Sequence, residues 1–436
     1  MDQVTAILDR LLALHPREID LSLGRMERLL AALGRPQDRL PPVIHIAGTN
    51  GKGSTTAFMR SILEASGLRV HVYTSPHLVA FNERIRLAGR LVTDARLIEA
   101  LDVCEQANAG AEITFFEVTT AAALLLFAEE PADVLLLEVG LGGRLDATNV
   151  VDAPLAATIT PLSMDHERYL GETLEAIAVE KAGILKSGCP AVIAPQPDEA
   201  MAAIGRVARE RGARPLVFGE DFTAWEENGR LVYQDDSGLL DLPHPRLFGR
   251  HQIVNAAMAI ASLRAAGRLP DAEAIGRGLV GVDWPGRMQP LRQGPLLELC
   301  APGTELWLDG GHNPGAAVAI AEVMGEQEER YPRPFYIVAG MLKTKDPVGR
   351  FRPFADLARE VACVPLTTTD AGRDPQCLAG SACEAGLTAS AFTSLTAALE
   401  HVRALSARDD VPPRVLVCGS LYLAGEVLAR NGMKPV

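Results

Sequence analysis

The segment HIAGTNGKGST, residues 45–55, decides the fold of this 436-residue chain. It follows an apolar run at 43–47 and leads into an amphipathic run at 54–65, so it joins a predicted strand to a predicted helix. Its glycines allow the turn to curl with backbone N–H groups pointing inward, and the start of the helix adds positive potential. Lys52 is placed to reach the terminal phosphates of a nucleotide. The segment therefore predicts a phosphate-binding loop.

The loop departs from the common pattern G-x-x-x-x-G-K-[ST] at two positions. Ile46 stands where the first glycine is expected, and Gly53 separates Lys52 from Ser54. Taken alone, these residues also fit a glycine-rich strand–helix turn that carries a surface lysine. Residues elsewhere in the chain are needed to distinguish a phosphate-binding loop from a simple strand–helix turn.

Around this loop, short apolar runs alternate with amphipathic runs, which is typical of an α/β fold with a mostly parallel sheet. The predicted strands lie at 43–47, 70–73, 134–139, 155–160 and 191–194, and the predicted helices at 54–65, 94–107, 117–128, 173–185, 198–211 and 252–266. The polar stretch 218–242 predicts a β-hairpin insertion.

After the breakers at 283–287 a second α/β alternation begins. Its predicted strands lie at 305–308, 335–339, 361–365 and 415–418. We therefore predict an N-terminal domain at 1–293 that resembles P-loop ATPases, with the β-rich insertion at 218–242. A smaller, Rossmann-like α/β C-terminal domain is predicted at 294–436.

The composition argues against several classes of protein. Lys and Arg number 42 against 55 Asp and Glu, a net charge of −13, which disfavours a general nucleic-acid binder. No apolar run is long enough to span a bilayer, and the first residues do not resemble a signal peptide. The seven cysteines form no C-x-x-C pair, which favours free thiols in a reducing compartment. We expect a cytoplasmic monomer without nucleic-acid or membrane partners.

The loop AGTNGKGST at 47–55 resembles the nucleotide loop of the folylpolyglutamate synthases, which belong to the superfamily of muramyl-peptide ligases. The additional glycine is normal in that family. The resemblance continues in order along nearly the whole chain, through TSPHL at 74–78, NERI at 82–85, LEVGLGGRLDATN at 137–149, MDH at 164–166, EKAGI at 180–184, PGR at 285–287 and DGGHNP at 309–314. It implies an ATP-dependent ligase that joins a carboxylate to an amino acid.

The resemblance also implies which residues contact ATP. They are Thr49, Asn50, Gly51, Lys52, Gly53, Ser54, Asn255, Arg287 and Asp309. An arginine beside the domain boundary, such as Arg287, suits charge stabilisation during phosphoryl transfer when the domains close. By themselves, Asn255 also fits a helix position without a role, Arg287 a surface charge and Asp309 a helix cap.

Glu138 ends an apolar strand, at the edge where parallel sheets bind ligands and where a magnesium ligand is expected. A strand-end carboxylate that caps a turn is the alternative. The resemblance implies two Mg²⁺ sites, one on Ser75 and Glu138 and a second on His166 and a carbamylated Lys181. A carbamate forms only on a neutral amine, so Lys181 would need a pKa lowered by partial burial.

For the two organic substrates, the resemblance implies contacts in several segments. Glutamate would meet Arg84, His312 and Ser420, and Arg84 suits a carboxylate by bidentate pairing. Pterin contacts would fall on Asp20, Leu21, Ser22, Leu23, Thr114, Phe115, Phe116, Glu117, Leu145, Asp146 and Ala147. Core packing is the alternative for Phe115 and Phe116.

We therefore expect ATP to phosphorylate the carboxylate of dihydropteroate, or the terminal glutamate of a reduced folate, before the L-glutamate amine attacks the acyl phosphate. The predicted catalytic residues are Lys52, Lys181, Arg287 and His312. Polyglutamylation alone and an ATPase switch that ligates nothing stay open as alternatives. A muramyl-peptide substrate is disfavoured because the phosphate loop begins near residue 45, leaving no room for a uridine-binding domain. A dehydrogenase is disfavoured because Leu145 takes the third glycine position of a dinucleotide motif.

Overall fold

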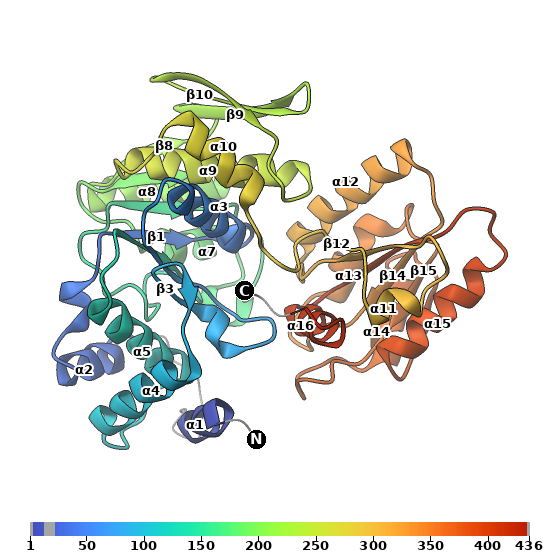
Figure 1. Ribbon diagram of the computed structural model, residues 1–436, viewed down its shortest axis with the longest axis horizontal. Helices are drawn as coiled ribbons and strands as arrows, with labels where there is room; N and C mark the ends of the chain where they lie inside the picture. The colour runs from blue at the N-terminus through green and yellow to red at the C-terminus, as the bar shows by residue number, and fades with distance from the viewer. Residues whose placement is uncertain (1–2, 13–21, 434–436) are drawn as a thin grey trace.

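The computed structural model describes residues 3–12 and 22–433 and shows two α/β bodies side by side (Figure 1). The N-terminal body is built on an eight-stranded sheet and the C-terminal body on a six-stranded sheet. The predicted α/β class is confirmed. Among the described residues, no helix combines the length and the apolar character that crossing a membrane requires.

The N-terminal sheet has the strand order β4-β3-β2-β5-β1-β6-β7-β8. Its strands are β1 (Val43–Ala47), β2 (Val70–Tyr73), β3 (Ile85–Leu87), β4 (Arg90–Leu91), β5 (Val134–Glu138), β6 (Ala156–Ile159), β7 (Pro190–Ile193) and β8 (Arg214–Val217). Six strands run parallel, in the order β2-β5-β1-β6-β7-β8. At the β2 edge, β3 and β4 are added in antiparallel pairing. The central strands are apolar and buried, as predicted, whereas the unpredicted β4 and β8 are edge strands with exposed residues.

Helices cover both faces of this sheet. One face packs against α3 (Lys52–Ala65), α9 (Arg250–Ala265) and α10 (Ala272–Gly281). The other face carries α1 (Gln3–Leu12), α2 (Gly24–Ala32), α4 (Asp94–Asn108) and α5 (Phe115–Glu129), with α7 (Leu174–Ala182) and α8 (Asp198–Arg211) over β6 and β7. The short turns η1 (Pro36–Arg39), η2 (Phe81–Arg84) and α6 (Glu167–Leu170) lie in connections. Neighbouring residues of a strand alternate between the two cores, so the sheet is fixed in register on both sides.

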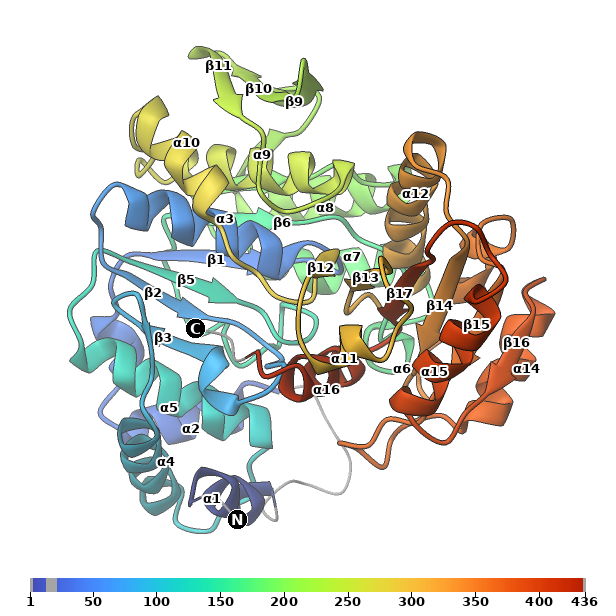
Figure 2. The ribbon, with the colours of Figure 1, turned by 45° about the vertical axis from the view of Figure 1, so that its right-hand side comes forward.

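The polar insertion forms a small sheet of its own, which stands at the top of Figure 2. It consists of β9 (Phe222–Glu227), β10 (Arg230–Asp235) and β11 (Gly238–Pro243), paired in the antiparallel order β11-β10-β9. The sequence predicted a single hairpin, and the structure adds a third strand after a second turn. Phe222, Leu231 and Tyr233 pack into the core above α9, which explains why this sheet is held in place.

The C-terminal sheet has the order β12-β13-β17-β14-β15-β16. Its strands are β12 (Gln289–Leu291), β13 (Glu305–Leu308), β14 (Phe335–Ala339), β15 (Glu360–Cys363), β16 (Ala389–Ala391) and β17 (Arg414–Cys418). All neighbours are parallel except β12 with β13. One face packs against α12 (Pro314–Arg330), α13 (Pro347–Phe351), η3 (Arg352–Phe354) and α14 (Pro375–Glu384), and the other against α11 (Pro295–Glu298), α15 (Leu395–Ser406) and α16 (Leu421–Arg430).

The chain passes from the first sheet to the second through residues 282–288, between α10 and β12. Because β12 already pairs with β13, the second sheet begins at residue 289, five residues before the predicted start of the C-terminal domain at 294. Helix α16 lies between the two bodies in Figure 2. It touches the N-terminal body, since a side chain on Gly425 would collide with the carbonyl oxygen of Leu78. The carboxyl ends of β1, β5 and β6 face this junction.

Candidate active site

The phosphate-loop segment lies between β1 and α3, with Lys52 as the first residue of the helix. Lys52 Nζ donates to the carbonyl oxygens of Gly48 at 3.1 Å and Thr49 at 3.5 Å, so the ammonium group folds back over the loop. Gly51 has φ +85°, a conformation that favours glycine, and a Cβ there would lie 2.4 Å from Asn255 Oδ1. The loop therefore presents its charge to a cavity that Asn255 borders.

This nucleotide cavity has a volume of about 440 Å³ and is lined by both bodies. It brings together every residue predicted to hold ATP or metal, and His312 with them. They are Thr49, Asn50, Gly51, Lys52, Gly53, Ser54, Ser75, Glu138, His166, Lys181, Asn255, Arg287, Asp309 and His312. Asp165, Gln252 and His251 also line it, although sequence reasoning did not assign them a role.

Glu138 ends β5 in this cavity with 3% of its surface exposed. Burial raises the pKa of its carboxyl group to about 7, against the lowering effect of Lys52 and Arg287. Its Oε2 atom is buried and has no hydrogen-bond partner. An orphaned carboxylate oxygen beside a phosphate loop fits a divalent cation such as Mg²⁺, which prefers one or two carboxylates with phosphate and water. In the described part of the chain, no three His, Cys, Asp or Glu side chains gather closely enough to hold a metal by themselves, so phosphate oxygens would have to complete the site.

Lys181 and His166 lie on the other side of the phosphate loop. Lys181 is buried in α7, and its Nζ donates to the carbonyl oxygen of Gly48 at 2.9 Å, the same atom that Lys52 contacts. Burial first, and then the charge of Lys52, lower the pKa of Lys181 to about 7. Burial also lowers the pKa of His166 to about 4, so its ring is neutral and able to bind a metal.

The segment from Gly286 to Asp309 closes the cavity from the side of the C-terminal body. Asp309 is buried and accepts hydrogen bonds from the backbone N–H groups of Met288 at 2.8 Å and Gly311 at 2.6 Å. Arg287 directly precedes Met288, and its Nη1 donates to the carbonyl oxygen of Gly286 at 2.9 Å. Asp309 therefore organises two loops that line the cavity, in addition to any contact with a nucleotide.

A second cavity, of about 360 Å³, adjoins the nucleotide cavity. It contains most of the residues predicted for the pterin and for glutamate, namely Ser22, Arg84, Thr114, Phe116, Glu117, Leu145, Asp146, Ala147, His312 and Ser420. Leu23 and Phe115 do not line it, and Phe115 packs edge-on against Phe81 instead. Asp20 and Leu21 lie outside the described residues. Tyr422 and Leu141 line the cavity without having been predicted, and Lys345 lines it as well.

Two carboxylates of the second cavity already have structural partners. Glu117 and Thr114 form a reciprocal capping box at the start of α5, and Arg25 Nε donates to Glu117 Oε2 at 3.0 Å. Asp146 accepts from the backbone N–H of Leu141 at 2.8 Å and from the hydroxyl of Thr148 at 2.6 Å. Each therefore shapes the cavity wall and has less capacity left for a bound ring.

Arg84 and Ser420 face the same cavity from opposite bodies. Arg84 Nε donates to His77 Nδ1 at 3.0 Å, and its guanidinium lies 5.0 Å from the centre of the Phe81 ring. Burial lowers the pKa of Arg84 below its usual range. Ser420 caps α16 by accepting the backbone N–H of Tyr422 at 3.1 Å. A half-buried arginine opposite a helix start fits a carboxylate between them.

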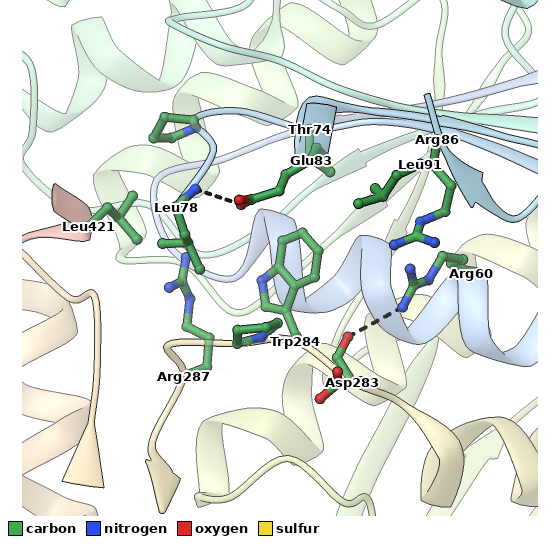
Figure 3. A pocket seen from close by; sticks show the side chains of 12 residues that line it. Arg60, Thr74, Leu78, Glu83, Arg86, Leu91, Asp283, Trp284, Arg287 and Leu421 are labelled. Atoms are coloured by element: carbon green, nitrogen blue, oxygen red, sulfur yellow. Dashed lines mark hydrogen bonds between the residues drawn. The ribbon is translucent and has the colours of Figure 1, made fainter. Parts of the chain in front are cut away.

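A third, smaller cavity of about 60 Å³ lies behind the phosphate loop, at the linker between the bodies. Figure 3 shows the Trp284 indole in its centre, with Arg60 and Arg86 to one side and Leu78 and Arg287 to the other. A Cβ on Gly53 would lie 2.7 Å from the Trp284 ring, so the linker packs directly on the phosphate loop. This close approach is the physical reason for the additional glycine after Lys52.

We expect Gly53→Ala to raise the KM for ATP about 10-fold, because the new methyl group would push the phosphate loop or the linker away from its position. Steady-state kinetics at saturating cosubstrates checks this. The matched control is Gly380→Ala on α14, where a Cβ meets nothing within 4 Å. Adding Trp284→Leu to Gly53→Ala should recover part of the lost affinity. An unchanged KM in Gly53→Ala would contradict the packing argument.

Comparisons with known proteins agree with this geometry. The Mur ligase middle domain family matches residues 46–263, and the Mur ligase glutamate ligase domain family matches residues 286–421. The chain is 35% identical to the dihydrofolate synthase/folylpolyglutamate synthase of Escherichia coli over 95% of its own length and 92% of that protein.

Two solved structures are similar over nearly the whole chain. E. coli FolC in complex with DHPP and ADP is 34% identical, with a TM-score of 0.86 and coverage of 98% of this chain and 97% of that one. A bifunctional folylpolyglutamate synthase/dihydrofolate synthase with Mn, AMPPNP and L-glutamate bound is 33% identical, with a TM-score of 0.84 and coverage of 98% of each chain.

Proposed function

Because this chain belongs to the Mur ligase family and is an ATP-dependent folate glutamate ligase within it, we propose that it joins L-glutamate both to dihydropteroate and to tetrahydrofolate. One observation carries the proposal. The nucleotide cavity and the second cavity share the wall formed by Ser75, Gly140, Leu141, His166 and His312. A flat acceptor in the second cavity can therefore bring its carboxylate to the end of a triphosphate in the first.

The reaction follows from that junction. A carboxylate oxygen of the acceptor takes the γ-phosphoryl group of ATP, and ADP leaves. The neutral amine of glutamate then attacks the acyl carbon, a C–N bond forms, the C–O bond to phosphate breaks, and the amine gives up a proton. Water or the product phosphate would accept that proton. Arg84 and Ser420, which both line the second cavity, would hold the glutamate carboxylates.

The chain contributes charge and position to phosphoryl transfer. Lys52 and Arg287 line the nucleotide cavity and would neutralise the triphosphate and the transferring group. Glu138 with Ser75 would hold one Mg²⁺, and His166 with a carbamate on Lys181 a second. Bound Mg²⁺ would neutralise phosphate charge and align the phosphoryl group for transfer. The lowered pKa of Lys181, about 7, supports the carbamate because it leaves a neutral amine near physiological pH.

We further propose that the enzyme works as a monomer, with ATP, L-glutamate and a folate acceptor as its ligands. The support is that one chain supplies residues on every side of both cavities. Sedimentation equilibrium in the presence of Mg-ATP checks this, and a dimer that dissociates with loss of activity would contradict it.

The test of the proposed function measures phosphate release with Mg-ATP and L-glutamate and compares dihydropteroate with tetrahydrofolate as the acceptor. Glutamate-dependent turnover with both acceptors, and amide products of the expected mass, is the predicted result. Turnover with tetrahydrofolate alone would restrict the enzyme to polyglutamylation. If the rate of phosphate release does not depend on glutamate or on the acceptor, the protein is an ATPase and the proposed ligase function is wrong.

A further inference from the structure

The carboxylate of Asp165 forms the contact between the two bodies on which this inference rests. Asp165 follows β6 in the N-terminal body, and 9% of its surface is exposed. Three side chains of the C-terminal body converge on its carboxylate: Lys345 Nζ at 2.5 Å from Oδ1, and Asn313 Nδ2 at 3.2 Å and His312 Nε2 at 3.4 Å from Oδ2. The backbone N–H of His166 donates to Oδ1 at 2.8 Å.

This set of donors uses the carboxylate fully. An ionised carboxylate offers about four acceptor positions, and Lys345, His166, Asn313 and His312 occupy them here. The partners of the Asp165 carboxylate therefore come mainly from the other body, and the Lys345 ammonium group pairs directly with it.

The contact extends to the phosphate loop. Asn313 Nδ2 also donates to Asn50 Oδ1 at 3.0 Å, and Asn50 Nδ2 donates to Ser163 Oγ at 3.1 Å. The Asn313 side-chain oxygen caps α12 by accepting the backbone N–H of Ala316 at 2.8 Å. One network thus connects the start of α12, the loop after β6 and the phosphate loop.

Lys345 supplies the positive charge of this network, and residues of the C-terminal body fix its position. Its ammonium group is buried with Asp165, with 9% of the side chain exposed. Arg373 Nη2 donates to the carbonyl oxygens of Lys343 at 2.9 Å and Lys345 at 3.1 Å, which fixes the connection between β14 and α13. Lys343, two residues earlier, is exposed, and its ammonium group donates to the carbonyl oxygen of Asp370 at 3.0 Å.

We propose that the Lys345–Asp165 ion pair is the latch that holds the C-terminal body closed over the two cavities, which makes Lys345 a positioning residue for ligation. Two opposite charges buried together attract strongly, and the donors from Asn313 and His166 to the same carboxylate help to offset the cost of taking the pair out of water. Closure places Arg84 and Ser420, which lie in opposite bodies, around the incoming glutamate. The role of closure in holding glutamate rests on the proposed function; the closure itself does not.

The experiment compares Lys345→Met with Lys343→Met, a matched loss of one lysine from the same connection. Lys345→Met should lower kcat/KM for L-glutamate about 10- to 100-fold, a range typical of coupling between sites. The dissociation constant of Mg-ADP should change less than about 2-fold, because Lys345 does not line the nucleotide cavity. Small-angle scattering with Mg-ADP should show a more open particle than the wild type. Lys343→Met should match the wild type in all three measurements.

Two further variants separate a latch from a structural role. Lys345→Arg keeps the charge and should recover part of the glutamate kinetics. Asp165→Asn combined with Lys345→Met should be no worse than the poorer single variant, because both remove the same pair. A fully additive double variant, a loss of Mg-ADP affinity equal to the loss of glutamate kinetics, or scattering identical to the wild type would each overturn the proposal. If the wild type does not ligate glutamate, the proposed function fails, and scattering with Mg-ADP still decides the latch.

Discussion

Glu138→Gln should lower kcat about 1,000-fold and yet make the ligand-free protein more stable above pH 7. The substitution keeps the shape of the side chain and removes its charge. Loss of activity follows because the carboxylate at the end of β5 would hold a cation on the triphosphate, and one such electrostatic contact is worth about 10²–10³ in rate. The gain in stability follows from the raised pKa.

The sign of the stability change is fixed by linkage. The pKa of Glu138 rises from 4.5 to about 7 on folding, so the folded protein binds the proton more tightly than the unfolded chain. The resulting destabilisation is complete above pH 7, on the order of 3 kcal/mol, and disappears as the pH falls toward 4.5. The glutamine variant lacks this penalty, so its advantage should grow between pH 5 and pH 8.

Denaturant unfolding of the ligand-free protein at several pH values checks the predicted gain in stability. Kinetics under saturating Mg-ATP check the predicted loss of kcat. Glu64→Gln is the matched control, because burial also raises the pKa of Glu64 but the residue lines neither large cavity. It should change the pH dependence of stability and leave kcat near the wild-type value. If the Glu138→Gln variant keeps its activity, Glu138 is not a ligand of the cation.

Lys181→Met should lower kcat at least about 100-fold and abolish any response of activity to bicarbonate. In the wild type, the pKa of Lys181 is about 7, so the amine is neutral above pH 7 and protonated below it. Because only the neutral amine reacts with carbon dioxide, carbamate and activity should both fall as the pH drops from 8 to 6. Added bicarbonate should restore part of the activity in that interval.

A ¹³C-bicarbonate NMR experiment detects the carbamate directly, and a bicarbonate-dependent activity profile follows its effect. The matched control is Lys186→Met, because burial also lowers the pKa of Lys186 but it lines neither large cavity. Lys186→Met should keep both the carbamate signal and the bicarbonate response. Full activity without carbon dioxide at pH 8 would show that the free amine suffices.

The phosphate loop and the central strands could be predicted from sequence because their signals are local. The apolar run before Gly48 and the amphipathic run after Lys52 need only neighbours a few residues away, and the predicted helix at 54–65 begins two residues after α3 does. The residues predicted to contact ATP and metal, which line one cavity, were implied by the family resemblance; for Glu138 the end of a parallel strand also indicated the position. The assignment of each residue's role remains a proposal.

The remaining features depend on contacts between distant parts of the chain. The carboxylate of Asp165 meets Lys345 across 180 residues, and although Asp165 lies in the motif MDH at 164–166, no local pattern indicates that the two residues pair. The packing of Trp284 on Gly53 is of the same kind. Glu117 is different: Thr114 and Glu117 form the T-x-x-E pattern of a capping box, so its structural role was visible in the sequence. Phe115 and Phe116 could not be separated, because only the orientation of α5 decides which ring faces the cavity.

The single passage of the chain through residues 282–288 has a consequence for how strong the contact between the bodies must be. A short tether holds the second body near the first at an effective concentration in the millimolar range. Contacts that would be too weak to join two separate proteins can therefore keep the cleft shut for much of the time. The tether also keeps the second body near the first whenever the cleft opens, so that the two can close again after a product as large as a glutamylated folate has left.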